Sequence, residues 1–137
     1  MTRSWKKKVI QPPASKLPQP RIKSTGSAIQ IGPLLFVSGQ SGRNVGEKDD
    51  YSPDPAEQAR RMMENVKVIL EEAGTSFDNV VKRTIFIKDP VAYQKMRPVV
   101  DGYFPSPVAS TSVQTGFLHD KLIEIEVIAV VPDGSDE

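Results

Sequence analysis

Hydrophobic and polar positions alternate near the carboxyl end of the chain, as they do in a β-strand. In residues 122–131 (LIEIEVIAVV) one face is apolar, whereas the other carries Glu124 and Glu126 between apolar neighbours. A carboxylate on a covered strand face must be paired, solvated or neutralised. The pattern therefore predicts either an edge of the core that is open to water or a site in which a carboxylate has a chemical role.

Two segments have the apolar spacing of helices, and both have clear start signals. Asp54 is placed to cap the first helix, Pro55 suits its first position, and Gly74 follows its last apolar residues. The Asp89-Pro90 pair repeats the same start, and the second helix is expected to end near Phe104.

The remaining apolar runs predict strands. Residues 27–31 and 34–38 are joined by a Gly-Pro turn, and residues 80–88, 109–115 and 122–131 follow. The predicted order is β-β-α-β-α-β-β, an α+β fold. Two helices cover one face of such a sheet and not both. An uncovered apolar face of that size usually marks an interface, so we expect a closed oligomer.

Composition limits the functions to be considered. The chain has 137 residues, as expected of one domain. Its 18 basic and 17 acidic residues give a net charge of +1, a balance that argues against a nucleic-acid partner. It has no cysteine and one histidine, so we expect no metal and no cofactor. We find neither a membrane-spanning apolar run nor a secretory signal, and therefore expect a cytoplasmic protein with no membrane partner.

The ends of the chain differ from its middle. Residues 1–21 form a basic, proline-rich arm, residues 22–132 form the predicted domain, and residues 133–137 form a short acidic tail. The arm has little to bury and favours extended conformations. It is interpreted either as a solvated tail, partly held by Val9 and Ile10, or as a segment that contacts phosphate or a neighbouring subunit.

Several segments, in their order and spacing, resemble the YjgF/RidA family over about residues 22–131. They are 34–40 (LLFVSGQ), 64–74 (ENVKVILEEAG), 78–82 (DNVVK), 86–89 (FIKD) and 122–129 (LIEIEVIA). The resemblance implies a chorismate-mutase-like α+β fold with a mixed sheet, two helices on one face and a homotrimer. It also implies hydrolysis of small enamines and imines to 2-oxo acids and ammonia, in clefts between adjacent subunits.

The resemblance also assigns roles to residues of this chain. Glu124 matches the glutamate that holds the attacking water, and Gly39 matches the glycine of the Ser-Gly-Gln segment that lines the pocket. Two family features are missing, because Ser110 stands where an arginine clamps the substrate carboxylate and Thr25 stands where a tyrosine lines the pocket. A hydrolase with an altered substrate is therefore expected.

Other side chains offer alternatives. Ser110, Thr111 and Ser112 offer hydroxyls to a substrate, and Arg97 is either a relocated anion clamp or a surface arginine. His119 and Asp120 offer a Ser-His-Asp nucleophile, but the sequence has no Gly-x-Ser-x-Gly motif, and the loop position of His119 favours an exposed histidine. Two further functions remain open beside the hydrolase: a non-catalytic small-molecule-binding trimer, and a ribonuclease or chaperone-like role.

Overall fold

The structure is a computed structural model that describes residues 5–46 and 50–132. Its strands are β1 (Lys8–Ile10), β2 (Ala28–Ile31), β3 (Leu34–Ser41), β4 (Val80–Ile87), β5 (Ala109–Gln114) and β6 (Ile123–Val130). Its helices are α1 (Pro55–Glu72) and α2 (Pro90–Asp101), with a short 3₁₀ turn at Phe77–Asn79. The helices and the five predicted strands lie where the sequence patterns place them.

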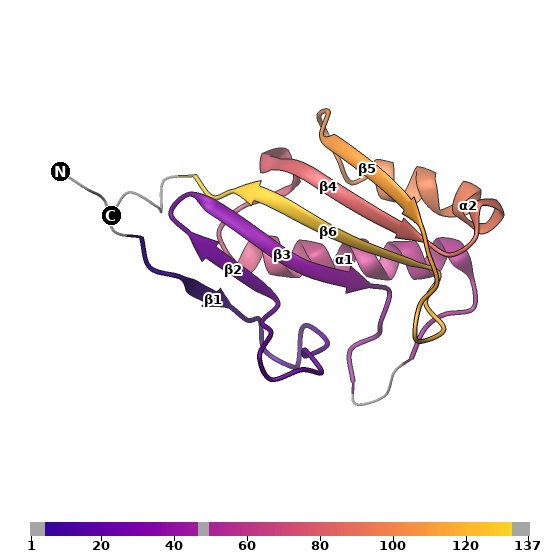
Figure 1. The fold of residues 1–137 in the computed structure, drawn as a ribbon, viewed down its shortest axis with the longest axis horizontal. Coiled ribbons are helices and arrows are strands. Elements are labelled where there is room, and N and C mark those ends of the chain that lie inside the picture. Colours follow the sequence, from indigo (N-terminus) through magenta and orange to yellow (C-terminus); the bar gives the residue numbers. More distant parts are fainter. Residues whose placement is uncertain (1–4, 47–49, 133–137) are drawn as a thin grey trace.

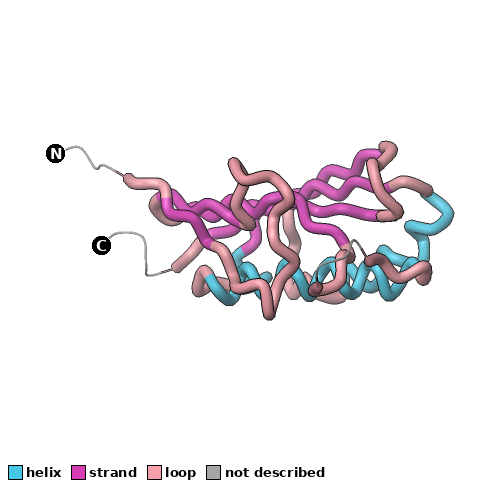
Figure 2. Tube along the Cα trace, turned by 90° about the horizontal axis from the view of Figure 1, so that it is seen from below, coloured by secondary structure: helices cyan, strands magenta, loops and turns pink. Residues whose placement is uncertain are grey.

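All six strands form one mixed sheet in the order β1-β2-β3-β6-β4-β5 (Figure 1). Only the β4–β5 pair is parallel, and the other neighbours are antiparallel. Both helices lie on the same face of this sheet (Figure 2). The predicted α+β fold, with two helices on one face of a mixed sheet, is therefore confirmed. The homotrimer stays a prediction.

Both helices begin at the residues that the sequence indicates. The Asp54 carboxylate accepts a hydrogen bond from the Glu57 N–H at 3.3 Å, and the Asp89 carboxylate accepts one from the Val91 N–H at 3.0 Å. A proline occupies the first turn of each helix, where a missing N–H costs nothing. Within the described ranges, neither helix is long and apolar enough to cross a membrane.

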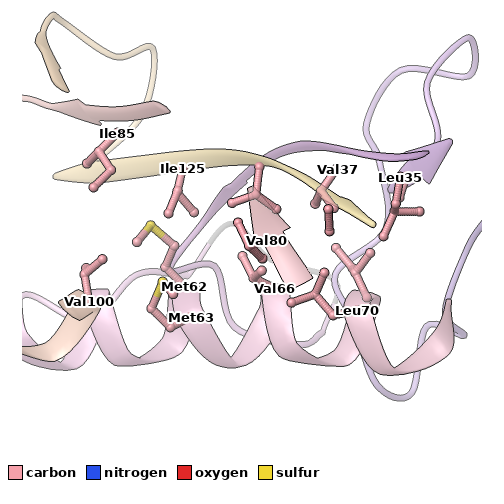
Figure 3. Close-up of a cluster of buried hydrophobic side chains, with 14 of the residues drawn as sticks. Leu35, Val37, Met62, Met63, Val66, Leu70, Val80, Ile85, Val100 and Ile125 are labelled. Carbon is pink, nitrogen blue, oxygen red and sulfur yellow. The ribbon is translucent and has the colours of Figure 1, made fainter. Parts of the chain in front are cut away.

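The core lies between the sheet and α1. The apolar stripe of α1 is fully buried and meets the inner face of the sheet (Figure 3). Its buried apolar residues are Ala59, Met62, Met63, Val66, Ile69 and Leu70. On β6, one strand face is buried throughout, as the alternation predicts, while Glu124 and Glu126 lie on the opposite face. That opposite face is covered by no helix of the described chain and exposes Phe36 and Val113.

The amino-terminal arm contributes one strand that the predicted order lacks. β1 pairs with β2 at the sheet edge, and Ile10 and Leu17 are buried in the core. A run of three residues is too short for hydrophobic alternation to reveal a strand. Residues 8–10 form a strand because they pair with β2. Residues 1–4 of the arm and the acidic tail 133–137 lie outside the described residues.

Candidate functional site

A cavity of about 560 Å³ lies where the end of β3 meets the beginning of β6. The loop before β2, the end of β3 and the β5–β6 loop surround it. The lining residues on which the site depends are Thr25, Gly39, Arg43, Asn65, Lys121 and Glu124. Since β3 and β6 are hydrogen-bonded neighbours with Ser41 opposite Glu124, the sheet itself fixes one wall.

Glu124 is held at the floor of this cavity. Its Oε1 atom lies 2.8 Å from the Nζ atom of Lys121, and its side chain is 26% exposed. Its other oxygen, Oε2, packs against the backbone of Gly39, where an added Cβ would come within 2.5 Å of it. Glycine is therefore required at position 39 for the carboxylate to take this place.

Gln58 connects the cavity loop to the first turn of α1. Its side chain is 1% exposed, accepts a hydrogen bond from the Leu122 N–H at 2.6 Å and donates to the Ser52 carbonyl at 2.9 Å. It also approaches the Asp120 carbonyl at 3.5 Å. The absence of a side chain at Gly42 lets the backbone of Gln58 pass, because a Cβ there would overlap it. The segment that carries Lys121 is thereby anchored to the helix.

We expect Gln58→Ala to destabilise the fold by about 1–3 kcal/mol, because it leaves the half-buried Leu122 N–H without its partner and removes a fully buried side chain. Chemical denaturation with a Gln94→Ala control, at an exposed position of α2, measures the difference. Equal midpoints for the two variants would show that the Gln58 hydrogen bonds contribute nothing to stability.

Asn65 fixes the chain where β3 ends. Its buried side-chain amide donates to the carbonyls of Ser41 at 3.0 Å and Arg43 at 2.9 Å. Arg43 in turn donates to the Gln19 carbonyl, which ties the loop before β2 to the same wall. The side chains of Asn65 and Arg43 thus link three segments of the cavity wall: α1, the chain at the end of β3 and the loop before β2.

The structure brings together three of the predicted site residues and leaves four outside this cavity. Thr25, Gly39 and Glu124 line it, although the Thr25 hydroxyl is already bonded to the Ile22 carbonyl at 2.7 Å. Arg97 and the β5 hydroxyl residues Ser110, Thr111 and Ser112 do not line it in a single chain. Their role toward a substrate stays a prediction, because it depends on a neighbouring copy.

The side chains near Ser110 are engaged in structural contacts. The Ser110 hydroxyl accepts a hydrogen bond from Arg83 Nε at 2.9 Å. The Arg83 guanidinium also pairs with Asp101 at 3.2 Å and stacks 4.8 Å from the centre of the Phe104 ring. The Arg83 guanidinium therefore joins β4, β5 and α2. His119 is exposed at the cavity rim, and Ser110 does not join it there.

We expect Arg97→Ala to leave ligand affinity in the cavity unchanged. Its side chain is 71% exposed, and its Nε atom pairs with Asp101 at 3.6 Å on the surface of α2. Titration calorimetry with 2-oxobutanoate on the wild-type protein and this variant makes the comparison. A loss of about tenfold or more, worth about 1.4 kcal/mol, would instead support the relocated clamp.

Sequence reasoning missed four residues of the site: Arg43, Gln58, Asn65 and Lys121. Lys121 stands three residues before Glu124. In a loop, a lysine and a glutamate at this spacing usually form an exposed ion pair, so the spacing does not indicate a half-buried one. Gln58 and Asn65 gave a usable signal, since both are polar residues on the buried side of an apolar helix. Such residues need buried partners, and their partners turn out to be the cavity loops. The described part of the chain holds no cluster of three or more side chains suited to a metal.

Comparisons with known proteins identify the family to which this fold belongs. A family model described as Endoribonuclease L-PSP matches residues 18–131. A RutC family protein of Pyrococcus abyssi is 40% identical over 116 residues, which cover 83% of this chain and 91% of that protein. The 2-iminobutanoate/2-iminopropanoate deaminase of Dermatophagoides farinae is 30% identical over 127 residues, covering 91% and 97%.

A solved structure agrees with these relatives. YyfA from Yersinia pestis, of the conserved Rid protein family, superposes with a TM-score of 0.84 at 31% identity, covering 92% of this chain and all of that one. The shared fold is that of a class of small α+β proteins that bind small molecules. The chain belongs to the YjgF/RidA family, which its family model describes as Endoribonuclease L-PSP.

Proposed function

We propose that the protein is a RidA-like hydrolase that converts a small enamine or imine to a carbonyl compound and ammonia. The observation that carries the proposal is the placement of Glu124, whose carboxylate lies inside the cavity against Gly39. Ser110 stands where an arginine clamps the substrate carboxylate, so the substrate, or the way its carboxylate is held, is altered, and 2-iminobutanoate serves as a probe of the reaction class. The similarity to a named 2-iminobutanoate/2-iminopropanoate deaminase supports the reaction class.

The proposed chemistry needs one carboxylate and one positioned water. An enamine first takes a proton at carbon and loses one from nitrogen to solvent, which gives the imine. Glu124 then accepts a proton from water through Oε2, the oxygen that is not bonded to Lys121, while the water oxygen attacks the imine carbon. The adduct takes that proton on nitrogen and becomes a neutral aminoalcohol. The hydroxyl proton then passes to the nitrogen through Glu124 while the oxygen electron pair forms C=O, and the C–N bond breaks to release ammonia. Holding water and substrate together supplies most of the remaining acceleration.

We propose further that three copies of the chain assemble and that the substrate binds in the clefts between them. The open sheet face exposes Phe36 and Val113, and every residue of β5 is exposed in the single chain. Large apolar residues gathered on one uncovered sheet face are typical of an interface. Such an assembly would bring the β5 hydroxyls of one copy toward a neighbouring chain.

One observation favours a second candidate, a trimer that binds a small molecule without transforming it. The Ser110 hydroxyl is occupied by Arg83, and Arg97 lies outside the cavity, so neither replaces the missing clamp in a single chain. The description of the family model adds ribonuclease action as an outcome to be tested.

The experiment generates 2-iminobutanoate in situ and follows its disappearance with and without the protein, with sedimentation of the same sample to establish its assembly. Acceleration by the wild-type protein that is lost in Glu124→Gln supports the hydrolase. An intact trimer that binds 2-oxobutanoate without accelerating imine loss supports the binding role. Cleavage of single-stranded RNA by the same preparation would point instead to the ribonuclease.

A further inference from the structure

We infer that Lys121 is the anion-binding residue of this cavity and that it bridges Glu124 to the carboxylate of a small monocarboxylate ligand. The inference deepens the proposed function, because it names the group that replaces the missing arginine. It can fail or hold separately from that function, since it concerns binding and not turnover.

The ammonium group of Lys121 is placed for a second anionic partner. Its side chain is 15% exposed, and Glu124 is its one hydrogen-bond partner among the described residues, at 2.8 Å. An ammonium group has three N–H donors, so two remain to be satisfied. The Phe117 ring lies 5.6 Å from Nζ and shields one side, which leaves the cavity as the direction from which a partner can come.

The other cations near the site are committed elsewhere. Arg43 donates to the Gln19 carbonyl, and Arg21 approaches the Tyr51 hydroxyl at 3.5 Å, so both hold the loops that form the walls. Arg83 is bound to Ser110 and Asp101, and Arg97 does not line the cavity. Lys121 is therefore the cation in the cavity lining that keeps N–H donors available to a ligand.

The surroundings select the class of ligand. The negative charge of the Glu124 carboxylate already lies beside the ammonium group. A monoanion is therefore tolerated better there than a dianion such as hydrogen phosphate. Ile22, Phe117 and Leu118 contribute apolar surface to the same cavity. A volume of about 560 Å³ suits a small molecule. A short 2-oxo acid or its imine, with an aliphatic substituent, meets these conditions.

The test measures binding of 2-oxobutanoate, which needs no turnover, by titration calorimetry on the full chain. We expect Lys121→Met to weaken binding by about tenfold or more, from the loss of a charged hydrogen bond. Lys121→Arg should restore most of the affinity, and Lys95→Met, at an exposed position of α2, should leave it unchanged. Wild-type affinity should fall with rising salt more than that of Lys121→Met.

A second variant keeps the inference testable if Lys121→Met does not fold. Glu124→Gln removes the like charge beside the ligand, so it should bind 2-oxobutanoate more tightly than the wild type. Unchanged binding in Lys121→Met, weaker binding in Glu124→Gln, or stronger binding of inorganic phosphate than of 2-oxobutanoate would each overturn the inference. So would failure of the wild type to bind 2-oxobutanoate at millimolar concentrations, even if imine hydrolysis is observed.

Discussion

Replacing Glu124 by glutamine is expected to lower the rate of imine hydrolysis by roughly 10²–10⁴-fold, the usual contribution of a positioned general base. Glutamine has nearly the same shape and can still accept from Lys121, so the cavity should persist. It cannot take a proton from water near neutral pH. The loss should therefore fall on kcat, and it is measured by following 2-iminobutanoate at saturating concentrations.

The matched control is Glu126→Gln. Glu126 lies on the same strand and the same sheet face, two residues further on, but it is exposed and does not line the cavity. We expect its activity to stay within about twofold of the wild type, since glutamine keeps the size of the side chain and Glu126 does not line the cavity. Equal losses in the two variants would mean that the strand's overall charge matters and that Glu124 has no special role.

Gly39→Ala should reduce activity by on the order of 10²-fold without unfolding the protein, because a misplacement of about 1 Å can cost that much. The added methyl group would come within 2.5 Å of Glu124 Oε2, so the carboxylate must move away from its wall. A flexible side-chain end can move, and the backbone is left intact. The kinetic assay, paired with a melting curve, separates displacement from unfolding.

Gly116→Ala provides the comparison. Gly116 lines the same cavity, yet an added Cβ would meet nothing within 4 Å. Its activity should match that of the wild type. Full activity in Gly39→Ala would mean that the carboxylate does not need the position seen here, and the proposed role of the Gly39 wall would be wrong.

The elements of the fold could be predicted because their signals are local. Asp54 with Pro55, and Asp89 with Pro90, determine where the helices begin through contacts within one turn. The alternation in β6 determines which face is buried, and the structure confirms it. β1 could not be predicted, because three residues in a basic, proline-rich arm become a strand only when β2 is beside them.

The candidate site could be predicted only in part. Glu124, Gly39 and Thr25 were identified by resemblance, and they do meet in one cavity. Lys121 was missed because its burial depends on Gln58 drawing the β5–β6 loop against α1, a contact between residues more than sixty positions apart. Arg83 was not singled out either, and its contact with Ser110 arises from strand pairing between β4 and β5.

The β5–β6 loop has a consequence for how such a protein diversifies. Phe117 and Lys121 come from this one short connection, and Glu124 follows directly on the strand. The strands at both ends are fixed by their ladders to β4, so the connection can be exchanged without rebuilding the scaffold. A graft of this loop would therefore carry Phe117 and Lys121 into a relative together, which makes it the natural segment to randomise in a selection for new substrates.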